Sequence, residues 1–141
     1  MELNKILNIR NIKVEDQIKK AIAQTKEELD GLDLERMCKI YSAYAVRNLL
    51  DRGVLSRFID TKDLDSEYSH SFVIALDSNS NYLVDLTYSQ FKDEEDVLFD
   101  LKENGYTQLN DEKWDHYLKV LPKENNFTID EAINGKQKKS R

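Results

Sequence analysis

The chain has 141 residues, of which 40% are apolar, and this is enough to bury the core of one domain. Its formal net charge of −6, from 27 acidic and 21 basic residues, disfavours proteins that coat nucleic acid, because these usually carry a basic excess. The single cysteine excludes a disulfide within the chain and a zinc site built from several thiolates.

The amino-terminal residues do not resemble a secretion signal. Met1 to Lys13 alternates apolar and charged residues and lacks the apolar core of a signal peptide. No later stretch approaches the ~18 apolar residues that a membrane span needs. We therefore expect a chain that is made in the cytosol and has no membrane span. Export as an effector without a cleavable signal would leave no mark in the sequence.

Two helices are predicted in the first part of the chain. Between Val14 and Leu32 apolar residues recur at helical spacing, and Gly31 is a suitable stop. Residues 33–51 form the second predicted helix, whose apolar band is wide enough for burial on more than one side. Gly53 suits the left-handed cap after it.

The apolar period then changes to that of strands. Residues 71–77 and 82–87 are the clearest strands, and residues 78–81 between them have the composition of a hairpin turn. Residues 54–60 are expected to form a further short strand, and the polar residues 62–67 a loop. The sequence therefore predicts a small antiparallel sheet in the middle of the chain.

Helices return in the last third. They are predicted at about residues 94–103 and 111–121, separated by an Asn-Gly pair, and residues 128–131 have the form of a capping box before a short final helix. Helices before and after a group of strands imply an α+β fold, in which helices surround a small sheet. We expect one domain that takes in the whole chain, residues 1–141.

Cys38 is the candidate nucleophile, because it lies near the start of a long apolar helix. A thiol attacks as the thiolate, and the free N–H groups at a helix start lower its pKa, as does a nearby imidazole. A helix that began at Asp33 would place Cys38 in its second turn, whereas a break near residues 35–37 would place the thiol at the helix start. If this thiol attacks a carbonyl group, backbone N–H groups at Cys38 and a donor from a loop would have to stabilise the resulting oxyanion.

His70 and Asp85 are the candidate partners of this thiol. His70 precedes the first clear strand and Asp85 lies in the second, so both share a face of the hairpin. A turn at residues 77–78 sets His70 opposite Asp85, with Cβ atoms ~5 Å apart, and a turn at residues 78–79 makes them diagonal neighbours at ~7 Å. A four-residue loop would keep the shared face but separate them.

Ordinary structural roles compete with this interpretation. A lone cysteine is more often a small buried apolar residue than a nucleophile, and a histidine at a strand edge is usually structural or solvated. Asp85 is less ordinary, because it interrupts an apolar run and a buried carboxylate needs a partner. His116, the other histidine, points away from the apolar face of its predicted helix, and we expect it to be solvated.

The segment from Cys38 to Phe91 resembles the transglutaminase-like branch of the papain-like superfamily. That family has a nucleophile helix ending in a glycine, a strand, a histidine that opens a hairpin, and an aspartate near the end of the next strand, often followed by a threonine. The matching positions here are Cys38, Ala45, 49–54, Arg57, 70–74 and 82–87. The resemblance implies a catalytic core over about residues 33–91 and a helical extension over about 92–135.

Several activities share this arrangement. They include arylamine N-acetyltransferases, transglutaminase-like peptidases, lasso-peptide leader peptidases and glutamine deamidases of bacterial toxins and effectors, and residues 85–91 look most like the last group. The resemblance implies that Cys38 is the nucleophile, His70 the base and then the acid, and Asp85 the orienting carboxylate. It implies a cysteine hydrolase that deamidates glutamine in, or cleaves, a protein or peptide substrate without a cofactor or metal. The alternative is a protein-binding module that keeps the fold without turnover.

Overall fold

The computed structural model describes residues 3–34, 36–78 and 80–135, with side chains from residue 14 onward. Its helices are α1 (Leu3–Glu28), α2 (Cys38–Asp51), α3 (Phe99–Asn104), α4 (Asp111–Val120) and α5 (Ile129–Asn134). Its strands are β1 (Ser56–Asp60), β2 (Ser71–Leu76), β3 (Asn81–Val84) and β4 (Tyr106–Gln108). All pairings are antiparallel, in the order β1-β2-β3-β4. The predicted α+β class is confirmed.

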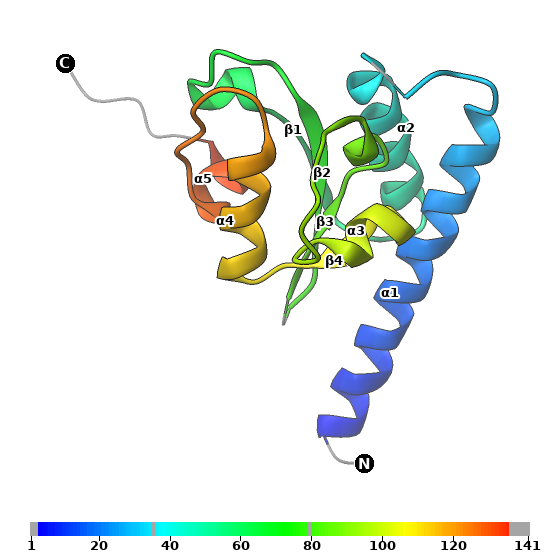
Figure 1. Ribbon diagram of the computed structural model, residues 1–141. Helices are drawn as coiled ribbons and strands as arrows, with labels where there is room; N and C mark the ends of the chain where they lie inside the picture. The colour runs from blue at the N-terminus through cyan, green and yellow to red at the C-terminus, as the bar shows by residue number, and fades with distance from the viewer. Residues whose placement is uncertain (1–2, 35, 79, 136–141) are drawn as a thin grey trace.

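The sheet lies between two layers of helices (Figure 1). Side chains alternate between the two faces along β2. Phe72 and Ile74 belong to one buried cluster, together with residues of α3, α4 and α5. Val73 and Ala75 belong to a second cluster, together with residues of α1 and α2. Because both faces are covered, β2 reads as a continuous apolar run.

The start of α2 differs from the expectation of a helix over residues 33–51. The helix begins at Cys38, and Arg36, just before it, has a φ of 65°. A left-handed residue breaks a right-handed helix, so the chain between α1 and α2 forms a loop. The first helix also differs from the predicted 14–32, because α1 begins at Leu3 and ends at Glu28.

The carboxy-terminal third contains a strand that the sequence did not predict. β4 spans three residues between two helices, which is too short for an alternating pattern to stand out. Gly105 opens it with a φ of 81°, and a Cβ there would lie 3.1 Å from Leu86 Cδ2. The glycine therefore permits both the left-handed turn out of α3 and the close approach of β4 to the sheet.

Two further predictions meet different outcomes here. α3 starts at Phe99, not at residue 94, because Asp93 forms a local turn in which its Oδ1 accepts the Glu95 N–H at 3.1 Å. The capping box at Thr128 and Glu131 is confirmed, with both reciprocal bonds present at the start of α5.

In the described part of the chain, no helix has the length and apolar character required to cross a bilayer.

Candidate active site

The structure brings Cys38, His70 and Asp85 together from three separate elements. Cys38 is the first residue of α2, His70 directly precedes β2, and Asp85 directly follows β3. His70 Nε2 lies 2.7 Å from Asp85 Oδ2. Cys38 is partly exposed as a residue, whereas His70 is 0% and Asp85 is 2% exposed. The site therefore combines a half-buried cysteine with a buried imidazole–carboxylate pair.

The hairpin register brings the histidine within reach of the aspartate. Leu76 pairs with Asn81, and the Asp77 N–H donates to the Ser80 carbonyl. Continued toward the strand ends, this register sets His70 opposite Thr87, so His70 and Asp85 are diagonal neighbours, as in the second of the two registers expected. Residue 79 itself lies outside the described residues.

The His70 backbone is held by the end of β1. Its N–H donates to Thr61 Oγ1 at 2.9 Å, and its carbonyl accepts the Thr61 N–H, also at 2.9 Å. Because both backbone groups of His70 are hydrogen-bonded to Thr61, the backbone position from which the imidazole extends is fixed. His70 is therefore positioned by the sheet edge as well as by Asp85.

Four donors converge on the Asp85 carboxylate. Oδ2 accepts bonds from His70 Nε2 and from the Tyr117 hydroxyl, each at 2.7 Å. Oδ1 accepts bonds from the Thr87 N–H at 3.0 Å and from its hydroxyl at 3.1 Å. Gln90 Nε2 donates to that hydroxyl at 3.1 Å, which leaves its proton directed at Asp85. An ionised carboxylate is an acceptor only, so this buried set of donors matches its hydrogen-bonding capacity.

Tyr117 is the site residue that the sequence reasoning missed. It lies on α4 and is completely buried, with a hydroxyl that reaches Asp85 from 32 positions away in the chain. By its position it belongs to the apolar face of the helix predicted at residues 111–121. The one signal in the sequence was a tyrosine at a core position, because a buried phenol needs a partner for its hydroxyl.

Asp85 changes the protonation of His70. Burial lowers the pKa of the imidazole, but the negative charge and the hydrogen bond of Asp85 outweigh burial and raise this pKa to about 9. The thiol of Cys38 acts in the same direction. At neutral pH the ring is therefore held as an imidazolium, which can later release a proton to a leaving group.

The environment of the sulfur favours the thiolate. Burial raises the pKa of the Cys38 thiol, but hydrogen bonding to His70 and to the Ser71 N–H outweighs burial and lowers it from the ordinary value of 9.0. The Ser71 nitrogen lies 3.5 Å from Sγ. With Nε2 engaged by Asp85, Nδ1 is the ring nitrogen left for the thiol. It has no partner of standard hydrogen-bond geometry among the described residues.

Aromatic rings enclose the imidazole on several sides. The Phe91 ring meets it edge-on, with centroids 4.9 Å apart and planes inclined at 76°. Phe72 stacks at 6.2 Å and Tyr117 lies at 6.3 Å. These rings exclude water from the His70–Asp85 pair, and this strengthens the electrostatic interaction between them.

Comparison of the chain with models of known protein families, with curated proteins and with solved structures finds no match. The function is therefore argued from the chemistry and geometry of the site.

His116 lies in a different environment from the solvated one expected. It is 8% exposed, and its Nε2 contacts Asp93 Oδ1 at 3.1 Å. The reason is that the segment before α3 folds back over α4 and covers the polar side of this helix. His116 has no contact with Cys38 or Asp85 among its described interactions.

Asp93, Glu95 and His116 have the donor types of a metal site, with one ligand atom of each within 4.8 Å of the others. However, Asp93 Oδ2 already accepts the Tyr88 hydroxyl at 2.8 Å and lies 3.7 Å from the Lys102 ammonium. That ammonium also binds the Asp93 carbonyl at 2.7 Å. A fixed cation already balances the acidic groups, so the cluster is better explained as a link between the segment before α3 and α4.

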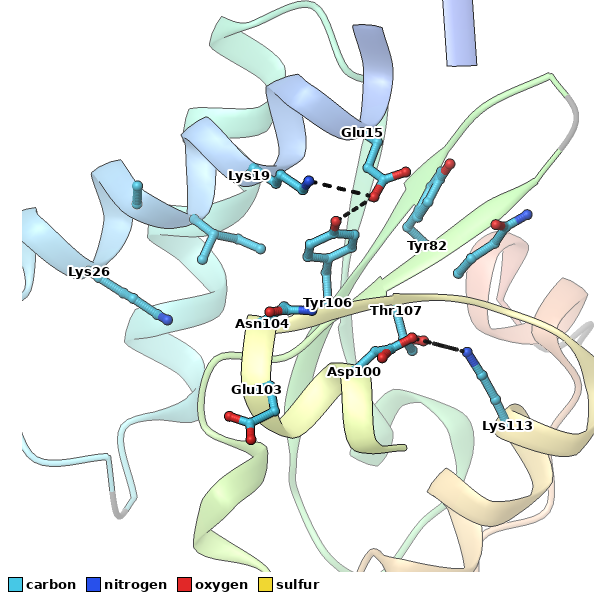
Figure 2. A pocket seen from close by; sticks show the side chains of 13 residues that line it. Glu15, Lys19, Lys26, Tyr82, Asp100, Glu103, Asn104, Tyr106, Thr107 and Lys113 are labelled. Carbon is cyan, nitrogen blue, oxygen red and sulfur yellow. Dashed lines mark hydrogen bonds and ion pairs between the residues drawn. The ribbon is translucent and has the colours of Figure 1, made fainter. Parts of the chain in front are cut away.

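Figure 2 shows a cavity whose lining residues do not include Cys38. It has a volume of about 650 Å³ and lies between α1, α3 and β4, where Tyr106 donates to Glu15 at 2.6 Å. A smaller cavity of about 300 Å³ is lined by Leu34 and Tyr41, which flank Cys38 in the sequence, and by Ser89, which follows Asp85. Cys38, His70 and Asp85 line neither cavity.

Proposed function

We propose that this protein is a cysteine hydrolase of the papain-like and transglutaminase-like type, which attacks protein or peptide amides through Cys38, His70 and Asp85. The observation that carries the proposal is the buried 2.7 Å contact between His70 Nε2 and Asp85 Oδ2, next to the only thiol of the chain. A carboxylate that orients an imidazole, which in turn activates a nucleophile, is the arrangement of a catalytic triad.

The chemical steps follow from the charges of the pair. The Cys38 thiolate attacks the amide carbon, so a C–S bond forms and the carbonyl oxygen becomes an oxyanion. His70 gives its Nδ1 proton to the departing nitrogen, the C–N bond breaks, and ammonia or an amine leaves. Water then adds to the thioester, neutral His70 accepts a proton from it, and the acid product leaves as the thiolate is restored.

The start of α2 offers donors for the oxyanion. The first N–H groups of a helix have no partner within the helix, and those at this end start with Cys38 itself. Met37, which precedes it, has a side chain that cannot cap them. No hydrogen bond joins the backbone N–H of Cys38 to another described residue, and this N–H can stabilise negative charge next to the sulfur.

The preferred substrate is a glutamine side chain in a protein, ahead of a peptide bond. This preference comes from the likeness of residues 85–91 to toxin and effector deamidases. Deamidation and peptide cleavage share the triad, and the walls of the cleft choose between them. The competing proposal, a binding module without turnover, predicts an ordinary thiol at Cys38.

The first experiment measures the rate of iodoacetamide labelling of Cys38 as a function of pH, in the unmodified protein and in His70→Ala. We expect fast labelling below pH 7 in the unmodified protein and loss of that reactivity in His70→Ala, because the imidazole stabilises the thiolate. His116→Ala is the matched control and should label like the unmodified protein. A slow thiol in the unmodified protein would refute the proposal.

The second experiment separates the two reactions. Candidate proteins are incubated with the enzyme or with Cys38→Ala, and their intact masses and the ammonia released are measured. Deamidation gives ammonia and the small mass gain of an amide turned into an acid, whereas peptidase activity gives fragments. If neither product appears while Cys38 still labels fast, the preference for protein amides is wrong.

A further inference from the structure

Ser71 has a buried hydroxyl that the fold does not use. It is the first residue of β2, directly after His70 and paired with Asp60 of β1. The side chain is 1% exposed, and its Oγ has no hydrogen-bond partner among the described residues. A polar group that is buried without a hydrogen-bond partner destabilises the folded state, so the presence of this hydroxyl needs an explanation.

Other buried hydroxyls nearby are satisfied. Ser56 Oγ donates to the Val54 carbonyl at 3.4 Å, and Ser66 Oγ donates to Asn125 Oδ1 at 2.6 Å. Thr61 donates to the Tyr68 carbonyl. The unpaired state of Ser71 is therefore not typical of this part of the fold.

The position of Ser71 points to the thiol as its partner. Side chains alternate along β2, so Ser71 shares the face of Val73 and Ala75, and that face is covered by α1 and α2. Cys38 begins α2, and its sulfur lies 3.5 Å from the Ser71 nitrogen. The N–H and the hydroxyl of one serine can serve the same acceptor, because rotation about χ1 alone re-aims the hydroxyl.

We propose that Ser71 is a positioning residue for the Cys38 thiolate, and that its hydroxyl turns to donate to Sγ once the thiol has lost its proton. The backbone N–H and the hydroxyl of Ser71 then hold the sulfur from the sheet side, while His70 holds it from the other. The hydroxyl keeps its own proton throughout. This inference rests on the proposed function, since it requires a thiolate at Cys38.

The timing follows from what a thiolate needs. A neutral thiol is a weak hydrogen-bond acceptor, so a bond from the Ser71 hydroxyl to it would contribute little. A thiolate is a strong acceptor and can accept hydrogen bonds from several donors. Two titratable groups act on the sulfur: His70 favours the thiolate and Asp85 opposes it. The charge of the Cys38 thiolate in turn raises the pKa of Tyr117. Ser71 adds a neutral donor to this set without adding a charge.

The test compares Ser71→Ala with Ser56→Ala. For each variant, the pH at which iodoacetamide labelling of Cys38 reaches half its maximal rate is measured together with Tm. In Ser71→Ala we expect that pH to rise by roughly 0.5 to 1 unit, because the thiolate loses a hydrogen bond. Its Tm should stay the same or rise, because the deleted hydroxyl has no partner in the resting fold.

Ser56→Ala removes a buried hydroxyl that is already bonded to Val54, on a strand next to β2. It should lower Tm and leave the labelling midpoint unchanged. Ser71→Thr keeps the hydroxyl and should restore the midpoint of the unmodified protein.

The outcomes separate this inference from the proposed function. A low midpoint in the unmodified protein that stays unchanged in Ser71→Ala overturns the role of Ser71 and leaves the hydrolase proposal standing. A midpoint at the ordinary thiol value in the unmodified protein overturns both. A Ser71→Ala variant with lower Tm and an unchanged midpoint would show that the hydroxyl is only structural.

Discussion

His70 shows how burial and charge compete at a single residue. Burial alone would lower the pKa of a fully enclosed imidazole, yet the adjacent Asp85 carboxylate raises it to about 9. At Cys38 burial likewise opposes the charged form, and hydrogen bonds to His70 and Ser71 reverse its effect on the thiol pKa. Both pKa shifts therefore act in the direction that favours a thiolate at Cys38 and an imidazolium at His70.

These shifts predict how stability depends on pH. The pKa of His70 is raised above 6.5 in the folded state, so its stabilisation is complete below pH 6.5 and is lost as the pH rises through about 9. The pKa of Cys38 is lowered, so its stabilisation is present above the ordinary thiol value of 9.0 and is lost as the pH falls through the folded value. Where the two pH ranges overlap, a rise in pH lowers the contribution of His70 to the free energy of unfolding and raises that of Cys38.

Of these two contributions to the pH dependence of stability, Cys38→Ala keeps that of His70 and removes that of the thiol. We expect the free energy of unfolding of this variant, measured by urea denaturation, to fall by up to about 3 kcal/mol between pH 6.5 and pH 9, at about 1.36 kcal/mol per pKa unit and less the part of the His70 shift that Cys38 supplies. The unmodified protein should show a flatter profile over the same range. A flat profile in Cys38→Ala would mean that Asp85 does not hold the proton on His70.

At the scale of elements, the boundaries of two helices decide the chemistry. α2 begins at Cys38 instead of five residues earlier, so the thiol lies where helix N–H groups are free. α4 carries Tyr117 to Asp85 and so joins the carboxy-terminal helices to the site. Residues of α4 and α5 also pack in the same apolar cluster as Phe72 and Ile74 of β2.

The link through α4 can be measured with a double-mutant cycle. Tyr117→Phe should lower the free energy of unfolding by about 1–3 kcal/mol, because a hydrogen bond to a buried carboxylate is lost. Combined with Asp85→Asn, the two effects should be non-additive by roughly 0.5–3 kcal/mol, as for groups in direct contact.

Tyr88→Phe is the matched control for this cycle. Tyr88 is a buried tyrosine of the same cluster, but its hydroxyl binds Asp93 at 2.8 Å. Combined with Asp85→Asn it should show a smaller coupling than Tyr117→Phe, because Asp85 acts on the Tyr88 hydroxyl through its charge and not through a hydrogen bond. Equal coupling in the two cycles would argue against a direct role of the Tyr117 hydroxyl.

At the scale of the whole molecule, the sheet needs both layers of helices. Phe72, Ile74 and Leu83 are 0% exposed because residues of α3, α4 and α5 cover them. Removal of these helices would expose one whole face of the sheet to water, at a cost that scales with its apolar area.

A fragment that ends at residue 91 tests this dependence. It contains the three candidate catalytic residues but none of α3, β4, α4 and α5. We expect it to lose cooperative thermal unfolding in circular dichroism and to lose the fast labelling of Cys38. A fragment that melted at the Tm of the complete chain would show that residues 33–91 are a self-sufficient core.

Local features of the chain predicted a large part of this arrangement. Apolar runs of strand length and the turn composition between them predicted the hairpin of β2 and β3, and Asp85 was singled out because a carboxylate in an apolar run needs a partner. The capping box at Thr128 was recognised because all its residues are adjacent in sequence. Each of these signals depends on neighbouring residues alone.

The remaining features depended on contacts between distant segments. The amino acids around His116 indicate a polar helix side, and only the folding of the segment at Asp93 over that side buries it. Tyr117 looks like any core tyrosine until α4 packs against the end of β3. The sequence by itself determined most of the elements and the three candidate reactive residues. Tertiary packing decided where α2 begins in space relative to the sheet and which donors reach Asp85, because those contacts join residues whose local patterns carry no information about one another.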